Sequence, residues 1–364
     1  MKKTLVALAV AAMAASSAAS AITVYEQDGT KIELSGSLRM YLGRMSDDQR
    51  GDLVNDGSRL KIRATHDLGN GLSAFAGYQL RFEKDSAKNK QAGSKSTWGD
   101  PTTRELFVGF AAKDVGALSF GRHTINADDF LNDSAYYMSA SASPLTTRSD
   151  KSVKFRSAEW NGFSFGLDYL FGNPDKNNAA YGDYKNGYSG VLFYNYDIDQ
   201  EQSLSAALLY TQERYEGLGT ATGMKNTQWG AHLGYVYGPA DIAVSYVNYR
   251  NTDVGSGYIG RGELVEDLAL TGKTKGNYIL LDAGYRVIPE SRAYFQWQRL
   301  DAKQSSEDYT AAIRNYYTVG IDYRFNKNVV PYVEYTHIRT KYAADYQSND
   351  DKDNVFGVGL RVHF

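Results

Sequence analysis

The sequence lacks cysteine altogether and contains only 6 prolines in 364 residues. Without cysteine there can be no disulfide framework, no thiolate metal ligand and no cysteine nucleophile. Neither sign of charge dominates, because 40 basic side chains face 42 acidic ones, and this balance argues against a nucleic-acid partner. Beyond residue 21 there is no run of 18 apolar residues, and the mean hydropathy is −0.47, which excludes helical membrane spans. A membrane β-barrel escapes this test, because only every second residue of its strands must be apolar.

The first 21 residues differ in composition from the rest of the chain. Lys2 and Lys3 precede an apolar stretch at 5–15, and small residues follow up to Ala21. This order is typical of a secretory signal peptide, and it predicts cleavage before Ile22. We therefore expect residues 1–21 to be a signal peptide and residues 22–364 to form a single domain.

Turn signals divide the mature chain into segments of strand length. Asn-Gly and Gly-Pro pairs supply the backbone angles that tight hairpins need. Short turns are predicted at 68–71, 113–116, 159–162, 197–200, 237–239, 288–290 and 325–328. Longer polar loops are predicted near 43–57, 84–100, 122–148, 172–187, 213–226, 250–275, 301–312 and 340–353. Seven short turns interleaved with eight long loops predict an all-β fold, a transmembrane 16-stranded antiparallel β-barrel.

The segment 355–364 shows the side-chain pattern of such a barrel. Large apolar residues alternate with small or polar ones and end on Phe364. Only a period-2 strand separates these residues onto two faces. We expect this segment to be the last strand, with Phe364 as its barrel-closing terminal aromatic residue. A soluble β-sandwich would also alternate, but it would not combine one rim of short turns with one rim of long loops.

Basic residues identify the face that meets water. In the segment 58–64, Arg59, Lys61 and Arg63 alternate with apolar side chains. Each cation would cost about 2–4 kcal/mol on the lipid face near the bilayer midplane, so the three are expected to line an aqueous interior. The same parity argument predicts a pore-lining basic cluster, which consists of Arg39, Arg59, Lys61, Arg63, Arg81, Arg104 and Arg148. Arg104 is assigned to the inner face because Phe107 is expected to face outward, and this assignment leaves Glu105 facing outward as well.

The segment 123–147 is the longest that could fold into the barrel, and it carries Asp128, Asp129 and Asp133. Opposite the arginines, these carboxylates would set a transverse field across a narrow passage. Loop composition alone leaves a second interpretation open, in which the acids only keep an external loop soluble.

Several segments make the chain similar to a known family. They are 24–31, 58–60, 103–109, 113–116, 120–122 and the terminal Phe364. Over nearly its whole length the chain resembles the general bacterial porins, the trimeric, sixteen-stranded outer-membrane diffusion channels of Gram-negative bacteria. It departs from them at 136–144, where many members carry a turn similar to Pro-Glu-Phe-Gly.

The resemblance implies an inward-folded third loop with constriction-loop acids Asp128, Asp129 and Asp133, opposite Arg59, Arg104 and Arg148. It implies a water-filled channel for passive diffusion of small hydrophilic solutes and ions, located in the outer membrane. The implied partners are outer-membrane lipids and lipopolysaccharide, two further copies in a homotrimer, and the barrel-assembly machinery, which would read Phe364.

Two alternative functions remain. A substrate-selective porin for oligosaccharides or anions would share the fold, although strand parity sends most aromatic rings outward. An outer-membrane hydrolase would need a nucleophile, and Ser164 in a Gly-x-Ser-x-Gly pattern lies within a period-2 strand, where that motif has no catalytic meaning. The five histidines have no metal-binding spacing. We therefore predict neither an enzyme, nor a metal site, nor a cofactor.

Overall fold

The computed structural model describes residues 21–82, 99–131, 134–139, 141–175, 183–216, 223–254, 272–304, 309–343 and 350–364. Residues 1–20 of the predicted signal peptide lie outside this described part, as does Asp133. No helix within the described ranges is long and apolar enough to cross a membrane.

Strands dominate the described residues. The first nine are β1 (Ile22–Gln27), β2 (Thr30–Arg44), β3 (Asp52–Asn55), β4 (Arg59–Gly69), β5 (Leu72–Phe82), β6 (Pro101–Ala112), β7 (Gly116–Thr124), β8 (Arg148–Ser157) and β9 (Phe163–Phe171). The others are β10 (Tyr184–Asp197), β11 (Gln202–Tyr215), β12 (Lys225–Tyr237), β13 (Ala240–Val254), β14 (Gly272–Ile288), β15 (Ser291–Gln304), β16 (Tyr309–Tyr323), β17 (Val329–Tyr342) and β18 (Asp351–His363). A short 3₁₀ helix, η2 (Asn126–Asp129), follows β7.

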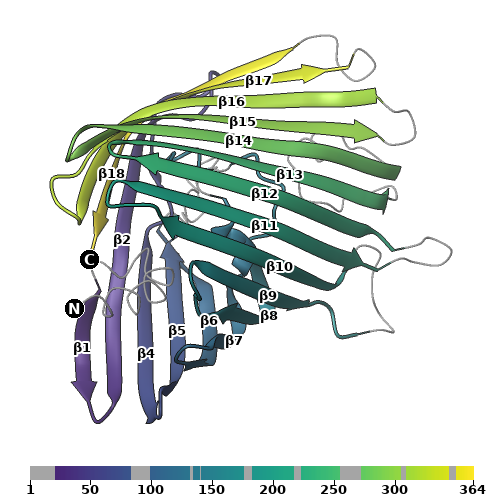
Figure 1. The fold of residues 1–364 in the computed structure, drawn as a ribbon. Helices are drawn as coiled ribbons and strands as arrows, with labels where there is room; N and C mark the ends of the chain where they lie inside the picture. The colour runs from purple at the N-terminus through teal and green to yellow at the C-terminus, as the bar shows by residue number, and fades with distance from the viewer. Residues whose placement is uncertain are drawn as a thin grey trace, which may run out of the picture.

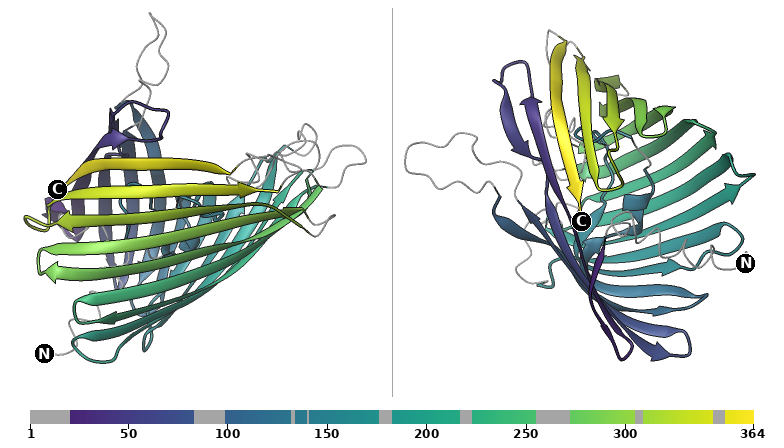
Figure 2. Two further views of the ribbon diagram at one scale, coloured as in Figure 1. Left: turned by 90° about the horizontal axis from the view of Figure 1, so that it is seen from above. Right: turned by 90° about the vertical axis from the view of Figure 1, so that its left-hand side faces the viewer.

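The strands form one closed antiparallel ring (Figures 1 and 2). Each strand from β4 to β17 pairs with the strands before and after it in the ring, β4 pairs with β2, and β18 returns to pair with β2. In the described residues, the short strands β1 and β3 each pair with β2. Of the eighteen strands in the sheet, sixteen therefore form the barrel wall, which confirms the predicted sixteen-stranded barrel.

All seven predicted short turns join consecutive strands at one rim, seen at the left and bottom of Figure 1. Asn70 and Gly71 have φ values of 54° and 77°, and Asn161 and Gly162 have 51° and 86°. Asn and Gly tolerate these left-handed angles, which two-residue hairpins require. The local sequence thus sets the rim of short turns.

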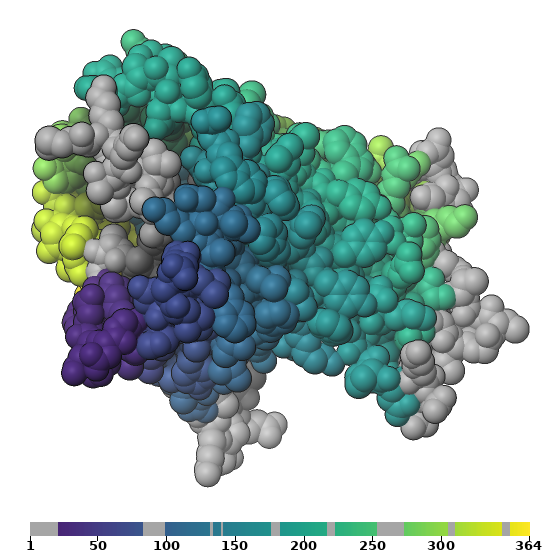
Figure 3. Space-filling view, turned by 60° about the horizontal axis from the view of Figure 1, so that its bottom comes forward, coloured from purple at the N-terminus to yellow at the C-terminus, as the bar shows by residue number. Residues whose placement is uncertain are grey.

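Side chains alternate between the two faces of the wall, as predicted. On β6, Leu106, Val108 and Phe110 are 58 %, 58 % and 52 % exposed on the outer face, while Glu105 is buried on the inner face. The purple-to-teal strands present a continuous outer surface (Figure 3). An apolar outside and a polar inside are what a barrel in lipid requires.

The ring closes between β18 and β2 beside Phe364. The backbone nitrogens of Phe364 and Gly36 each donate to the other residue's carbonyl oxygen, at 3.0 and 2.7 Å. A Cβ atom on Gly36 would lie 2.5 Å from the Phe364 ring, so only glycine allows this ring to pack on β2. Ile22 of β1 pairs with Leu34 nearby, and β1 therefore continues the line of β18 along β2.

Candidate functional site

A hollow of about 330 Å³ lies inside the barrel between η2 and the wall strands β2, β4, β5, β6, β7 and β8. Four acidic side chains line it: Glu105, Asp128, Asp129 and Glu159. Seven cationic side chains also line it: Arg39, Arg59, Lys61, Arg63, Arg104, Lys154 and Arg156. Five of the seven cations predicted from strand parity thus gather around one space.

Arg81 and Arg148, the other two predicted cations, lie close to this group. Arg59 is in register with Arg81 on the neighbouring strand, and Arg39 is in register with Arg361. The charged groups that act on Arg59 include Arg39, Arg81, Arg361 and Arg148. Like charges directly opposite each other on neighbouring strands are destabilising, so the fold maintains an unfavourable concentration of positive charge here.

Arg104 reaches the hollow through a β-bulge. The register between β5 and β6 pairs Gln79 with Glu105 and then Leu80 with Thr103, so Arg104 is the extra residue. A bulge turns two consecutive side chains toward one face. The expectation that Glu105 faces outward is therefore wrong: it is buried inside, 3.5 Å from Arg104 and 3.7 Å from Lys61. Phe107 also faces inward, because it lines the same hollow.

The predicted acids Asp128 and Asp129 lie in η2 and line the hollow opposite the arginines. Asp129 is 3.4 Å from the Arg156 guanidinium. The pKa of Asp128 is raised mainly by burial and, to a smaller extent, by the neighbouring Asp129 carboxylate, while Arg104 and Arg148 act in the opposite direction. The net effect is that Asp128 holds a proton more readily than an ordinary aspartate.

The segment that contains these acids is joined to wall side chains from its first residues. The Asn126 backbone nitrogen donates to Asp168 of β9 at 3.1 Å, and its side-chain nitrogen donates to the same carboxylate at 3.0 Å. Ser189 of β10 also donates to Asp168, at 2.6 Å. A Cβ atom on Gly166 would lie 2.1 Å from the Asn126 side chain, so this glycine allows the segment to approach β9.

Further contacts hold the middle of the segment. Ser134 donates to Asp282 of β14 through its backbone nitrogen, at 2.7 Å, and through its hydroxyl. The Glu334 carboxylate on β17 accepts from the backbone nitrogens of Tyr136, Tyr137 and Met138, at 2.7, 3.2 and 2.9 Å. Hydrogen bonds to charged acceptors are stronger than neutral ones, so Glu334 is a strong anchor.

Stacked tyrosine rings accompany this anchor. Tyr137 stacks on Tyr41 of β2 with ring centres 4.1 Å apart and planes 8° apart. Tyr136 stacks on Tyr332 of β17 at 4.4 Å and 18°. Tyr41 and Tyr332 are 0 % and 2 % exposed. These two inward-facing rings are covered by their neighbours and offer no free aromatic surface to a solute.

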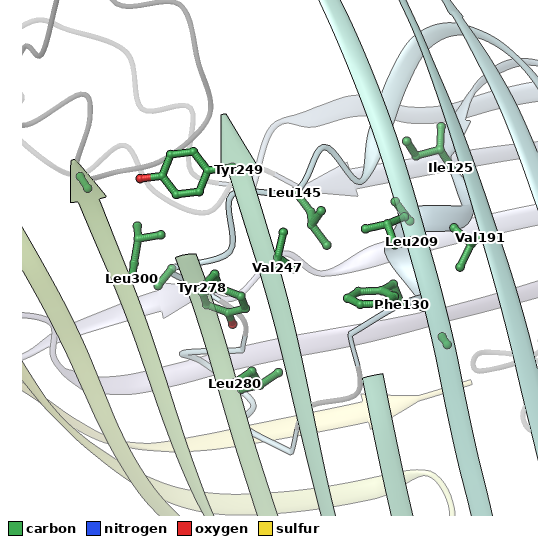
Figure 4. Packing of buried hydrophobic residues seen from close by; sticks show 14 of the residues in the cluster. Ile125, Phe130, Leu145, Val191, Leu209, Val247, Tyr249, Tyr278, Leu280 and Leu300 are labelled. Carbon is green, nitrogen blue, oxygen red and sulfur yellow. The ribbon is translucent and has the colours of Figure 1, made fainter. Parts of the chain in front are cut away.

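An apolar cluster fixes the same segment from the other side (Figure 4). Ile125, Phe130 and Leu145 from the segment pack with Leu209 of β11 and Val247 of β13. The strands that supply this cluster are β9, β10, β11, β13, β14, β15 and β16, whereas the cations that line the hollow come from β2, β4, β6 and β8. Interior apolar residues on these strands were not anticipated from the sequence, because a water-filled barrel is expected to have a polar inner face.

The wall acids that hold the segment were also not predicted from the sequence. Asp168, Asp282 and Glu334 are each less than 6 % exposed. Each occupies an inward position between outward-facing neighbours, so strand parity could have placed them, but it could not have identified their partners.

One further pair bears on the hydrolase alternative. Ser119 Oγ lies 3.3 Å from His123 Nε2, and His123 Nδ1 lies 3.1 Å from the Thr124 carbonyl oxygen. Ser119 sits within the extended strand β7, not on the strained turn of a nucleophile elbow. In the described ranges, no three His, Asp or Glu side chains are grouped to hold a metal ion.

A family model and the most similar curated proteins agree on one family for this chain. A family model described as Gram-negative porin matches residues 7–345. The major outer membrane protein of Pasteurella multocida strain Pm70 is 35 % identical, and the alignment covers 100 % of both chains. A second Pasteurella multocida major outer membrane protein is 35 % identical over the same full coverage.

Solved structures share the fold at low sequence identity. The anion-selective porin from Comamonas acidovorans has a TM-score of 0.67 at 17 % identity, covering 92 % of this chain and 100 % of that one. OmpF of Salmonella typhi, in complex with daunomycin, has a TM-score of 0.65 at 18 % identity, covering 94 % and 100 %. The chain belongs to the Gram-negative porin family, and it is an outer-membrane diffusion channel.

Proposed function

We propose that small hydrophilic solutes and ions pass between the basic wall and the segment 125–147, which folds into the barrel and narrows the channel. The observation that carries this proposal is the hollow itself, with arginines on the wall side and Asp128 and Asp129 on the segment side. The anchors at Asp168, Asp282 and Glu334 support a fixed position for the segment. Selectivity would then come from the width of the passage and its charges.

The charges on the two sides of the hollow suggest a transverse field. Positive and negative side chains on opposite walls of a low-dielectric channel orient dipolar solutes and filter them by charge. Cations outnumber acids among the lining residues, seven to four, so we expect a preference for anions. Pore-lining roles for Arg39, Arg59, Lys61, Arg63, Arg81, Arg104 and Arg148 are part of this proposal.

Planar-bilayer recording tests the proposal. The purified protein is expected to insert into the bilayer with discrete, ohmic conductance steps. In a KCl gradient, the sign of the reversal potential should show that chloride permeates more readily than potassium. Absence of steps would contradict the channel. Steps with cation preference would contradict the roles given to the arginines.

We also propose what surrounds the channel and how the chain reaches the membrane. Apolar outward side chains support contact with outer-membrane lipids and lipopolysaccharide, and the Vibrio cholerae OmpT structure described as a trimer form supports a homotrimer. We further propose that residues 1–21 are removed as a signal peptide and that Phe364 is read by the barrel-assembly machinery. Mass measurement of the exported protein, with Ile22 as its first residue, tests the cleavage site. Native electrophoresis tests the trimer.

We propose that the protein carries out no bond chemistry. Ser119 and His123 are the strongest contrary observation, because a hydroxyl and an imidazole are within 3.3 Å. An active-site fluorophosphonate tests this pair. Labelling of wild-type protein that is lost in Ser119→Ala would establish a hydrolase and contradict the proposal.

A further inference from the structure

The Arg59 cluster, which we define as Arg39, Arg59, Arg81, Arg104 and Arg148, holds more positive charge than its surroundings neutralise. Glu105 is shared between Arg104 and Lys61, and Asp129 is engaged by Arg156. Among the described residues, neither Arg59 nor Arg148 forms an ion pair. Glu105 and Asp129 are therefore already paired, and Asp128 is a further acid whose charge acts on both Arg104 and Arg148.

Some donors of this cluster also lack acceptors, although Arg39 donates to Ser37 and Arg104 donates to Gln79. The Nε atoms of Arg59, Arg81, Arg104 and Arg148 are buried and have no hydrogen-bond partner among the described residues. Buried donors without acceptors carry a desolvation penalty. Several such donors from strands β4, β5, β6 and β8, next to one hollow, indicate a place built for acceptor oxygens.

The chemistry of guanidinium selects among anions. Its planar donor fork matches the oxygen spacing of phosphate and carboxylate, whereas chloride can accept no paired, directional bonds. A solute with several oxyanion groups can contact arginines on neighbouring strands at once and so relieve the repulsion between Arg59 and Arg81. A monovalent ion cannot bridge them. The hollow, at about 330 Å³, has the volume of a small-molecule site.

We propose that the Arg59 cluster binds small solutes that carry two or more oxyanion charges, in the form of phosphate or carboxylate groups, and so favours their passage over that of monovalent anions. This inference rests on the proposed channel function and adds its substrate class. Glu105, Asp128 and Asp129 bound the site and oppose binding, so the affinity is expected to remain weak enough for release into the channel.

Single-channel recording tests this inference with inorganic pyrophosphate as the probe, citrate as a carboxylate probe and acetate as a monovalent control, at constant ionic strength. We expect brief current blocks from pyrophosphate and citrate and none from acetate. Blocks from only one of the two would assign the site to that oxyanion chemistry and still support it. Equal currents with acetate and pyrophosphate would overturn the inference while leaving the channel function intact, whereas a lack of conductance would contradict the channel itself.

Matched variants locate the site. Arg59→Gln and, independently, Arg148→Gln are expected to weaken the pyrophosphate block about tenfold, because each removes one charge-assisted contact. Arg250→Gln removes the same charge from an exposed position at the end of β13 and should keep the wild-type block. If one of the two cluster variants fails to fold, the other variant still tests the inference. Unchanged block in a folded cluster variant would overturn the inference.

Discussion

The Glu334 carboxylate accepts a hydrogen bond from the backbone nitrogen of Tyr136 at 2.7 Å, although 198 residues separate the two in sequence. With the bonds from Tyr137 and Met138, one wall side chain holds three consecutive backbone donors. The middle of the segment 125–147 is thereby tied to the wall opposite its starting strand.

Removal of this anchor should loosen the segment. In Glu334→Ala, the three backbone donors lose their acceptor, and each bond to a charged group is worth about 1.5–3 kcal/mol. We expect larger open-channel current noise and more frequent closures in bilayer recordings. Glu26→Gln, on exposed β1, is the control and should behave as wild type. A quiet Glu334→Ala channel would show that the remaining contacts, at Asp168, Asp282, the stacked tyrosines and the apolar cluster, fix the segment without this anchor.

Neutralisation of the basic wall should change ion selectivity. In the triple variant Arg59→Gln, Arg104→Gln, Arg148→Gln, the positive potential on one side of the hollow falls, while Asp128 and Asp129 remain. The reversal potential in a KCl gradient is expected to shift toward cations, and the shift should be largest at low salt, where screening is weakest. An unchanged reversal potential would mean that the ions do not pass this wall.

Acidification should shift selectivity toward anions. Burial and Asp129 raise the pKa of Asp128, so as the pH falls its carboxyl takes up a proton at a higher pH than an ordinary aspartate. Loss of that negative charge makes the hollow more positive. Reversal potentials measured across a pH series should therefore begin to move before ordinary aspartates titrate.

Two variants assign this titration. Asp128→Asn should be more anion-preferring at neutral pH and should lose the early part of the shift. Asp199→Asn, in the exposed β10–β11 turn, where hydrogen bonds from Glu201 and Gln202 lower the pKa of Asp199, should titrate as wild type. If Asp128→Asn retains the whole shift, another group titrates in the channel.

Truncation of Phe130 should destabilise the segment's apolar support. This ring is 1 % exposed, and a Cβ atom on Gly230 would lie 2.8 Å from it. Phe130→Ala is expected to lower the free energy of unfolding by about 3–5 kcal/mol, as measured by urea titration of the folded protein. Phe325→Ala is the control, since Phe325 is 69 % exposed in a short turn. Equal losses in the two variants would argue against a packed interior at Phe130.

The interior site was only partly predictable. Parity along β4 placed Arg59, Lys61 and Arg63 inside, because strand alternation is a local property. The same rule failed at Glu105 and Phe107. Strict alternation from the inward-facing Arg104 would turn both side chains outward, but the bulge at Arg104 inserts one extra residue and both face inward. The acids in η2 were expected opposite Arg59, Arg104 and Arg148, and Arg104 and Arg148 do act on Asp128, but the pairing of Asp129 with Arg156 was not foreseen.

The barrel could be predicted from local patterns, because period-2 alternation and Asn-Gly turns depend on residues close together in the sequence, and their succession along the chain gives the interleaved short and long connections. The contacts that build the interior could not be predicted in this way. The bulge at Arg104, the bonds of Glu334 to the segment around Tyr136 and the gathering of arginines around Arg59 each depend on register between strands or on residues far apart in the chain. Such pairings become definite only when the ring closes, because closure fixes which side chains face each other across the interior.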